Sequence, residues 1–285
     1  MGALLYPSGS FPHTPGVTLA EKLRVTPGLK VVLEEFPTDV TPGYKQKPDM
    51  DAILRQHAAR MAELQYLMFA ENKRALLIVL QAMDTGGKDG TIRHVMTGLN
   101  PAGVHVTSFK VPSEEERAHD FLWRIHQAVP RLGDFGIFNR SHYEDVIVVR
   151  VHNLVPRSVW KDRYDQINAF ERHLVENNVT ILKFFLHISK DAQKERLQAR
   201  IDDKTKNWKL SLGDFEERKH WAEYQQAYAD AVSRCSTERA PWYIIPADKK
   251  WFRNLAVAEI MLETLESMKM KYPKPTIDPR TIKLR

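Results

Sequence analysis

The chain has 285 residues, of which 27% are charged and 43% are hydrophobic, and its formal net charge is +6. A single cysteine, Cys235, excludes an intrachain disulfide and a multi-cysteine zinc site, and it fits a reducing cytoplasm. No apolar run reaches the ~20 residues of a membrane span, and the basic surplus favours an anionic partner such as a nucleic acid, an anionic membrane or a polyphosphorylated molecule.

Residues 1–48 are rich in Pro, Gly and Thr, which predicts an irregular N-terminal arm, disordered before about Thr18. The next segment, Asp49–Asn72, carries apolar residues at helical spacing. The continuous apolar run Ala75–Leu80 is typical of a buried parallel strand. A long helix followed by a buried strand therefore opens the main domain.

The same alternation continues along the chain. Further strands are predicted at Val104–Phe109, Phe135–Phe138, Thr180–Ile188 and Trp242–Ile245. Further helices are predicted at Glu114–Gln127, Arg157–Asn177, Ser189–Asp203, Asp214–Arg234 and Asp248–Met270. We therefore expect a three-layer α/β/α fold with a parallel sheet over residues 49–271, followed by a Pro-rich, basic tail over residues 272–285. Ligands of such sheets bind at the carboxyl ends of the strands.

A glycine-rich turn follows the first strand, and a helix-like segment follows the turn. Backbone N–H groups of such a turn bind phosphate oxygens, and Lys88 adds a positive charge. The turn departs from the pattern G-x-x-x-x-G-K-[ST] at Ala82 and Asp89, and Asp84 adds a carboxylate that suits Mg²⁺. The alternative is a plain Gly-Gly turn after a buried strand. The predicted phosphate-binding residues of the turn are Gly86, Gly87, Lys88, Asp89 and Gly90.

A second polar cluster follows the strand Phe135–Phe138. It begins with Asn139 and Arg140, and the guanidinium of Arg140 could neutralise phosphoryl charge. The alternative is a capped helix start, with Ser141 as the N-cap and Glu144 as its partner three residues later. Both interpretations can hold, because Asn139 and Arg140 can face a ligand beside such a cap.

A stripe of cations follows the strand Thr180–Ile188. Arg196, Arg200 and Lys204 are spaced four residues apart, so we expect them on one helical face. The alternative is a solvated face, but many phosphate-loop kinases carry a mobile lid after this strand. Additional phosphate-binding cations are predicted at Arg93, Arg124, Lys204, Lys206 and Lys209.

The chain resembles the family-2 polyphosphate kinases in four blocks that occur in the family's order. These blocks are residues 81–90, residues 138–146, residues 184–190 with Arg196 and Arg200, and residues 240–248. Together they cover roughly Asp49–Tyr272. The resemblance implies a phosphate-loop kinase domain over residues 49–271 with a helical lid at about residues 189–213. It also implies a homodimer or homotetramer.

The resemblance further implies reversible transfer of the terminal phosphoryl group between inorganic polyphosphate and a nucleotide, with Mg²⁺. Asn139 together with Glu144 is similar to the subgroup that phosphorylates both AMP and ADP, although many members have Asp in place of Asn139. The predicted nucleotide-binding residues are Asn139, Arg140 and Glu144, and the predicted metal ligand is Asp84. The predicted catalytic residues are Asp84, Lys88, Arg140, Arg196 and Arg200.

Charge neutralisation and positioning are what phosphoryl transfer mostly requires. We expect direct in-line attack, since no side chain is placed as a covalent phospho-acceptor. One alternative is an ATP-dependent nucleotide or small-molecule kinase on the same fold. Another is a basic nucleic-acid-binding protein without catalysis, but the acids inside the phosphate loop would repel a nucleic-acid backbone. We therefore expect neither a nucleic acid nor a membrane as the partner.

Overall fold

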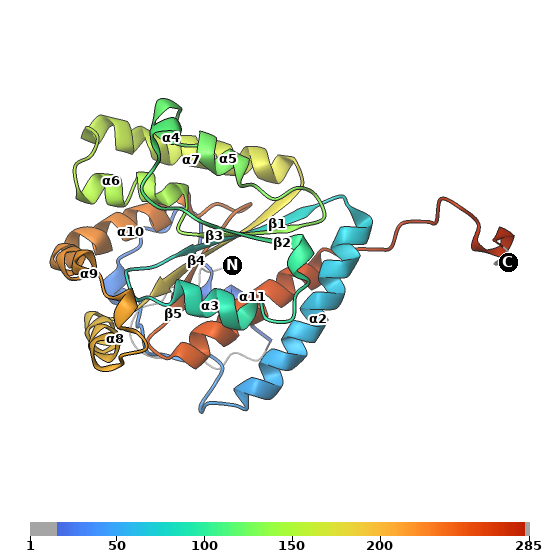
Figure 1. Cartoon of the computed structure of the whole chain (residues 1–285), viewed down its shortest axis with the longest axis horizontal. Helices are drawn as coiled ribbons and strands as arrows, with labels where there is room; N and C mark the ends of the chain where they lie inside the picture. Colours follow the sequence, from blue (N-terminus) through green and yellow to red (C-terminus); the bar gives the residue numbers. More distant parts are fainter. Residues whose placement is uncertain (1–15, 283–285) are drawn as a thin grey trace.

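A five-stranded parallel sheet forms the centre of the computed structural model, which describes residues 16–282 (Figure 1). The strand order is β2-β3-β1-β4-β5. The strands are β1 (Ala75–Gln81), β2 (Val104–Ser108), β3 (Phe135–Asn139), β4 (Val179–His187) and β5 (Trp242–Pro246). This topology confirms the predicted α/β fold, and the disorder predicted before Thr18 falls almost entirely outside the described residues.

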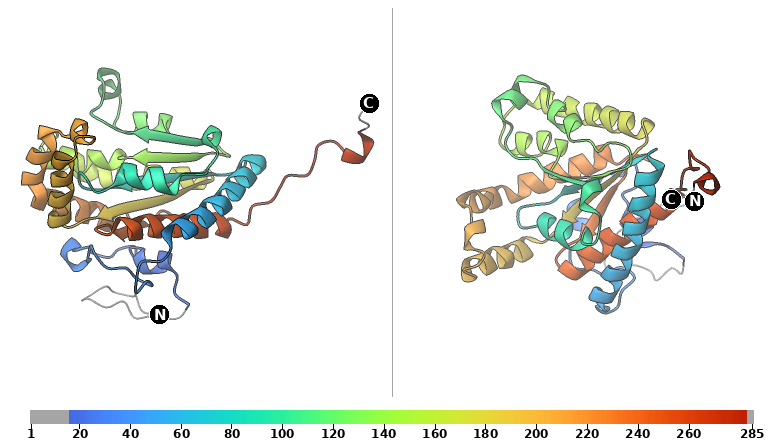
Figure 2. Two further views of the ribbon diagram at one scale, coloured as in Figure 1. Left: turned by 60° about the horizontal axis from the view of Figure 1, so that its bottom comes forward. Right: turned by 45° about the vertical axis from the view of Figure 1, so that its right-hand side comes forward.

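Helices cover both faces of the sheet, as Figures 1 and 2 show. One face carries α2 (Met50–Glu71), α3 (Lys88–Val95) and α11 (Lys250–Ser267), and α11 packs against the other two. The other face carries α6 (Val148–Val151), α7 (Arg157–Glu176) and α10 (Trp221–Cys235). Every residue of β1 is buried as a result. Burial on both faces explains why this strand is a continuous apolar run and does not alternate.

The register of the sheet brings the strand ends that matter into line. Leu80 of β1 pairs with Asn139 of β3, and Gln81 pairs with Phe185 of β4. The loop after β1 and the loop after β3 therefore leave the same edge side by side. The segment after β4 also begins at this edge, with α8 (Lys190–Asp202), η4 (Asn207–Lys209) and α9 (Leu212–Glu217).

The N-terminal arm contributes α1 (Leu19–Leu23) and η1 (Leu33–Glu35), and α1 packs beside α11 and β5. Beyond α11 the chain runs away from the sheet and ends with η6 (Pro279–Thr281) (Figure 2). The boundaries at residues 48 and 271 stay predictions. Among the described helices, none combines the length and the apolar character needed to cross a bilayer.

Two segments that were predicted as continuous helices are each divided into two, so these predictions were wrong. The segment Glu114–Gln127 forms two short helices, α4 (Glu114–Ala118) and α5 (Trp123–Gln127). Between them the Asp120 carboxylate accepts a hydrogen bond from the Leu122 N–H at 2.9 Å. Such a local side-chain bond competes with the helical ladder and favours a turn. The segment Asp214–Arg234 is likewise divided into α9 and α10 by η5 (Arg218–His220).

Candidate active site

The phosphate loop leaves β1 at the centre of the sheet edge and ends at the first turn of α3. Its turn is closed by a hydrogen bond of 2.9 Å from the Gly86 N–H to the Met83 carbonyl. Gly87 is the N-cap of α3 and has φ +103°, a left-handed conformation that disfavours a side chain. The N-terminal N–H groups of α3 thus open at the carboxyl edge of the sheet, a geometry that suits an anion.

Lys88 folds back over this loop. Its Nζ donates to the Ala82 carbonyl at 2.9 Å. Desolvation lowers the pKa of Lys88, and the neighbouring Arg140 lowers it further, while Asp84 acts in the opposite direction. The lysine is therefore held among charged groups and not in open solvent.

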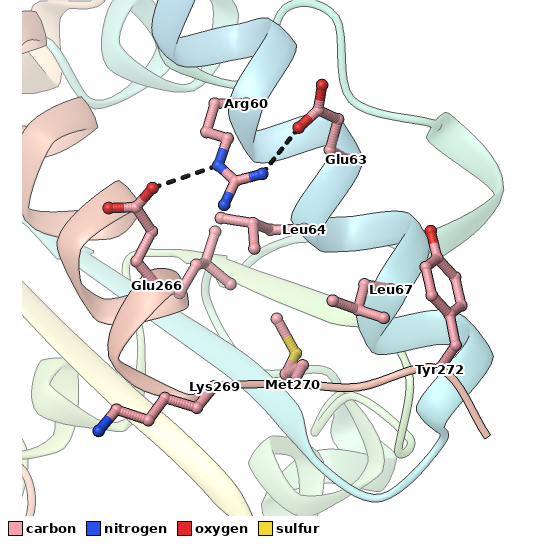
Figure 3. Close-up of a pocket in the computed structure, with 9 residues that line it drawn as sticks. Arg60, Glu63, Leu64, Leu67, Glu266, Lys269, Met270 and Tyr272 are labelled. Carbon is pink, nitrogen blue, oxygen red and sulfur yellow. Dashed lines mark hydrogen bonds and ion pairs between the residues drawn. The ribbon is translucent and has the colours of Figure 1, made fainter. Parts of the chain in front are cut away.

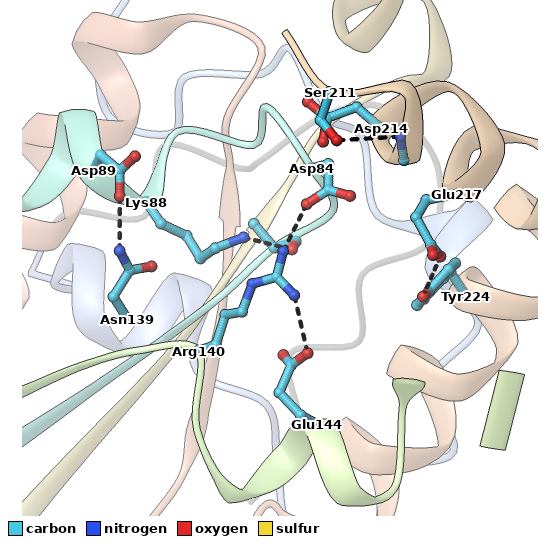
Figure 4. Close-up of polar contacts among 12 residues, drawn as sticks. Asp84, Lys88, Asp89, Asn139, Arg140, Glu144, Ser211, Asp214, Glu217 and Tyr224 are labelled. Carbon is cyan, nitrogen blue, oxygen red and sulfur yellow. Dashed lines mark hydrogen bonds and ion pairs between the residues drawn. The ribbon is translucent and has the colours of Figure 1, made fainter. Parts of the chain in front are cut away.

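Arg140 joins the two loops. Its Nη2 donates to Asp84 Oδ1 at 2.9 Å, and its Nη1 donates to Glu144 Oε2 at 3.3 Å (Figure 4). Glu144, and to a smaller extent Asp84, raise the pKa of Arg140 above its usual range. Its backbone has φ +63°, which is uncommon for a residue with a side chain. The structure therefore brings Asp84, Lys88, Arg140 and Glu144 together.

Asn139 and Asp89 form a second link between the loops. The Asn139 amide donates to Asp89 Oδ1 at 2.7 Å (Figure 4). Ser141 is an N-cap, as predicted, and its Oγ accepts from the Tyr143 N–H at 3.2 Å. The predicted partnership with Glu144 was wrong, because the Glu144 carboxylate is paired with Arg140 instead.

A buried ion pair supports the segment after β3 that carries Arg140 and Glu144. Lys183 of β4 lies 2.5 Å from the Glu171 carboxylate of α7, and both side chains are almost fully buried. Tyr143 accepts a hydrogen bond from Lys183 at 2.9 Å and donates one to Glu171 at 2.8 Å. Tyr143 lies in the short helix η3 (His142–Asp145) that also carries Glu144. The ion pair thus fixes the segment from which Arg140 and Glu144 project.

Arg196 of α8 ties the segment after β4 to the phosphate loop. Its Nη1 donates to the Thr85 carbonyl at 3.0 Å, and its Nη2 donates to the Ala247 carbonyl at 2.5 Å. Gln193, one turn earlier, donates to the Asp84 carbonyl at 3.0 Å. The first half of α8 is thereby fastened to the loop that it was predicted to cover.

Arg200 lies further along α8 and is paired within the same segment. Its Nη1 donates to Asp214 Oδ2 of α9 at 2.9 Å. Burial, and next the charge of Asp84, raise the pKa of Asp214. Asp214 therefore lies near Asp84, and both residues are labelled in Figure 4.

Lys204 does not share a helical face with Arg196 and Arg200, because α8 ends at Asp202. Lys204, Lys206 and Lys209 are exposed on the turn that follows, and Arg93 is exposed on α3. Arg124 is buried and donates to the Lys110 carbonyl at 2.8 Å. No hydrogen bond or ion pair within residues 16–282 joins these five cations to the phosphate loop. Their phosphate-binding roles stay predictions.

Asp84 suits a metal that is shared with a phosphate. Mg²⁺ is usually bound by one or two carboxylates together with substrate phosphates, and not by an all-protein cage. The described residues contain no group of three or more acidic, His or Cys side chains that could form such a cage. Asp84 Oδ1 is engaged by Arg140, and the next residue, Thr85, has a buried hydroxyl oxygen without a hydrogen-bond partner in the described chain. Oxygen donors of this kind fit Mg²⁺.

A separate pocket of about 370 Å³ lies between α2 and the end of α11 (Figure 3). Its arginine, Arg60, is already neutralised by Glu63 at 2.8 Å and Glu266 at 3.2 Å. The end of α11 lies near the start of β1, since Arg74 donates to the Met268 carbonyl at 2.9 Å. This pocket is therefore at the amino edge of the sheet, opposite the phosphate loop.

Residues 44–273 match the family model described as polyphosphate kinase 2. The chain belongs to the polyphosphate kinase 2 family. A curated relative from Meiothermus ruber, an AMP/ADP-polyphosphate phosphotransferase, is 53% identical over 90% of this chain and 96% of its own length. An ADP-polyphosphate phosphotransferase from Rhodopseudomonas palustris is 47% identical over 90% of this chain and 93% of its own length.

Solved structures of the family have the same fold. The crystal structure of polyphosphate kinase 2 from Arthrobacter aurescens TC1 superposes with a TM-score of 0.89 and 45% identity, covering 93% of this chain and 94% of that one. The resemblance found in the sequence is thus confirmed over nearly the whole kinase segment.

Residues that the sequence did not single out also belong to the site. Gln193, Asp214 and Tyr228 are three of them, and Tyr228 donates to the Ala82 carbonyl at 3.0 Å. Gln193 could have been found, because it lies three residues before Arg196 on a predicted helix. Tyr228 carries no such signal, since only the packing of α10 brings it beneath the loop.

Proposed function

We propose that this protein transfers the terminal phosphoryl group of inorganic polyphosphate to AMP and to ADP, reversibly. The observation that carries the proposal is the position of Arg140 between Asp84 and Glu144, beside Lys88 and the phosphate loop. The names of the relatives from Meiothermus ruber and Rhodopseudomonas palustris support the same substrates.

The phosphate loop and Lys88 would hold phosphates near the transfer point. The N–H groups at the start of α3 would face the bound phosphate, and Lys88 adds a charge that is held in place by the Ala82 carbonyl. Arg140, Arg196 and Arg200 would neutralise the charge that develops on the transferred group. In phosphoryl transfer such preorganised cations supply most of the rate enhancement.

Asp84 would hold Mg²⁺, and Arg140 would orient the Asp84 carboxylate for that task. When bound, magnesium supplies charge neutralisation between adjacent phosphate groups. Asp89 would assist through water, because it lies in the first turn of α3 and its exposed side chain contacts Asn139.

Asn139, Arg140 and Glu144 would contact the nucleotide. They come from the end of β3 and the segment after it, beside the phosphate loop and supported by the buried pair Lys183–Glu171. We propose that the segment 189–213 acts as a lid that carries Arg196 and Arg200 beside the phosphates. We also propose a cytoplasmic homodimer or homotetramer.

The acids at the site argue against a nucleic acid as the partner. Asp84, Asp89 and Glu144 lie around the Lys88 and Arg140 cations, where they would repel a continuous phosphate backbone that lacks a metal. An ATP-dependent kinase on the same fold differs in its donor and acceptor, so an assay separates the two.

The test is to incubate the protein with Mg²⁺, inorganic polyphosphate and either AMP or ADP, and to separate the nucleotides. We expect ADP and ATP from AMP, and ATP from ADP. Omitting Mg²⁺ or using the Lys88→Ala variant serves as the negative control. Inert polyphosphate, together with phosphorylation of an organic hydroxyl from ATP, would refute the proposal and support the ATP-dependent kinase.

A further inference from the structure

Arg253 is a buried arginine that the proposed mechanism does not use. It lies in the first turn of α11, and only 3% of its surface is exposed. Its Nε and Nη2 donate to the Asn254 side chain at 3.1 and 2.9 Å. No carboxylate within residues 16–282 lies within ion-pair distance of it. Burying a charge without a counter-ion normally costs stability.

The guanidinium of Arg253 is pressed against the glycines of the phosphate loop. A Cβ atom placed on Gly87 would lie 1.8 Å from Arg253 Nη1, and one placed on Gly90 would lie 3.2 Å from Nη2. The contact arises because α11 packs beside α3 on the same face of the sheet (Figure 1). Arg253 thus contacts, from the side of α11, the turn whose N–H groups form the anion site.

Neighbouring cations add to the unbalanced charge. The pKa of Arg253 is lowered to about 10, first by burial and then by Arg196, so the side chain stays protonated at neutral pH. Burial lowers the pKa of Lys250, and the charges of Arg196 and Arg253 lower it further. The nearby Asp248 is occupied, because its carboxylate accepts from Thr38 Oγ1 at 2.6 Å and from the Ser189 N–H at 2.9 Å.

We propose that Arg253 is a positioning residue of the phosphate site. It holds the Gly87–Gly90 turn in place from the side of α11, and phosphates bound on the turn compensate its charge. The proposal rests on the proposed function only in that the ligand is a chain of phosphates. A phosphate held by the loop N–H groups supplies the anion that Arg253 lacks. Because the side chain is buried, its attraction for that phosphate is little screened by salt.

This role makes a prediction that a merely structural arginine would not. Arg253→Met removes an uncompensated buried charge and keeps a long side chain, so the ligand-free variant should unfold at the same temperature as the wild type or higher. Its affinity for tripolyphosphate, measured by titration calorimetry without nucleotide, should fall roughly tenfold to a hundredfold. Arg253→Lys keeps the charge and should recover part of the affinity.

Arg74 provides the matched control at the opposite edge of the sheet. It is paired with Glu71 at 2.9 Å and donates to the Met268 carbonyl. Arg74→Met should lower the unfolding temperature and leave tripolyphosphate affinity unchanged. In steady-state assays Arg253→Met should raise the KM for polyphosphate, while the KM for the nucleotide should not change.

Unchanged tripolyphosphate affinity in Arg253→Met would overturn the proposal. If affinity falls but Arg253→Met also unfolds at a lower temperature, damage to the fold is a competing explanation, and Arg253→Lys separates the two. Recovery of affinity with the restored charge supports the role, and affinity that remains as low as in the Met variant overturns it. These binding measurements need no turnover, so they stand even if the wild type makes no ADP or ATP from polyphosphate.

Discussion

Asp84 and Arg140 are separated by 56 residues in the chain, yet the carboxylate of one lies 2.9 Å from the guanidinium of the other. The contact exists because β1 and β3 are adjacent and end at the same level. The acid that we propose as the metal ligand and the arginine that we propose to bind phosphate are thereby held as a unit. Each keeps the other in place before substrate arrives.

We expect Asp84→Asn to lower turnover roughly a hundredfold or more, because the variant loses the charge that would hold Mg²⁺ and orient Arg140. The amide keeps the size of the side chain, so the unfolding temperature should change little. The check is kcat with polyphosphate and ADP, beside Asp51→Asn on the exposed surface of α2 as control. Wild-type turnover in Asp84→Asn would remove Asp84 from the mechanism.

Arg196→Ala should weaken the use of polyphosphate and also slow turnover. The substitution releases α8 from the carbonyls of Thr85 and Ala247 and removes a cation from the site. We expect kcat/KM for polyphosphate to fall on the order of a hundredfold. Lys194→Ala, on the exposed side of the same helix, is the control. Equal effects from the two variants would show that Arg196 has no special part.

Gly87→Ala should inactivate the enzyme for a steric reason. The new methyl group would meet Arg253 Nη1 at 1.8 Å, and φ +103° is strained for any residue with a side chain. Gly98 also has positive φ, but a methyl group there meets only the Ala58 side chain at 3.4 Å. Gly98→Ala therefore controls for backbone strain alone. Comparable kcat/KM losses in the two variants would argue against the clash with Arg253.

Lys183→Met should be strongly destabilising, because it leaves the Glu171 carboxylate buried without its partner. Removing one member of a buried pair typically costs about 3–5 kcal/mol of unfolding free energy. Urea unfolding would measure it, and the double variant Lys183→Met with Glu171→Gln should recover part of the loss. A double variant no more stable than the single one would show that the pair is not the cause.

Histidine 187 should make stability depend on pH. Burial lowers the pKa of His187 from 6.5 to about 4, and its Nε2 contacts the Leu33 carbonyl at 3.2 Å. Because the unfolded chain binds this proton more readily, stability is complete above pH 6.5 and is lost as the pH falls towards 4. The contribution is on the order of 3 kcal/mol.

The check is the pH dependence of the unfolding free energy in His187→Gln, which can still donate to Leu33 but does not titrate. The variant should lose less stability than the wild type between pH 6.5 and 4. Parallel curves for the two proteins would contradict the assignment.

Local patterns sufficed for the parallel sheet, which the structure confirms. The spacing S-x-x-E forms a capping box at Ser113, but at Ser141 it misled, because Arg140 competes for the Glu144 carboxylate. Periodicity describes one element at a time and cannot represent such competition.

Contacts between elements that are far apart in the sequence could not be predicted, for a related reason. Tyr228 and Arg253 reach the loop, and Asp214 reaches Arg200, only through the packing of α9, α10 and α11, and nothing in their local sequence marks the direction of their side chains. Lys183 is a similar case, since a lysine inside the apolar run of β4 gives no sign that its partner is Glu171.

The clamp formed by Arg196 limits how the active site can open. Since α8 is fastened to the phosphate loop through Gln193 and Arg196, swinging the whole helix outward would tear its hydrogen bonds from the loop backbone. Among the described residues, the stretch 203–217 makes no hydrogen bond or ion pair to the loop and is held through the Arg200–Asp214 pair instead. Substrate entry should therefore require movement of the stretch 203–217 alone. The phosphate loop and the first half of α8 should keep their shape throughout the catalytic cycle.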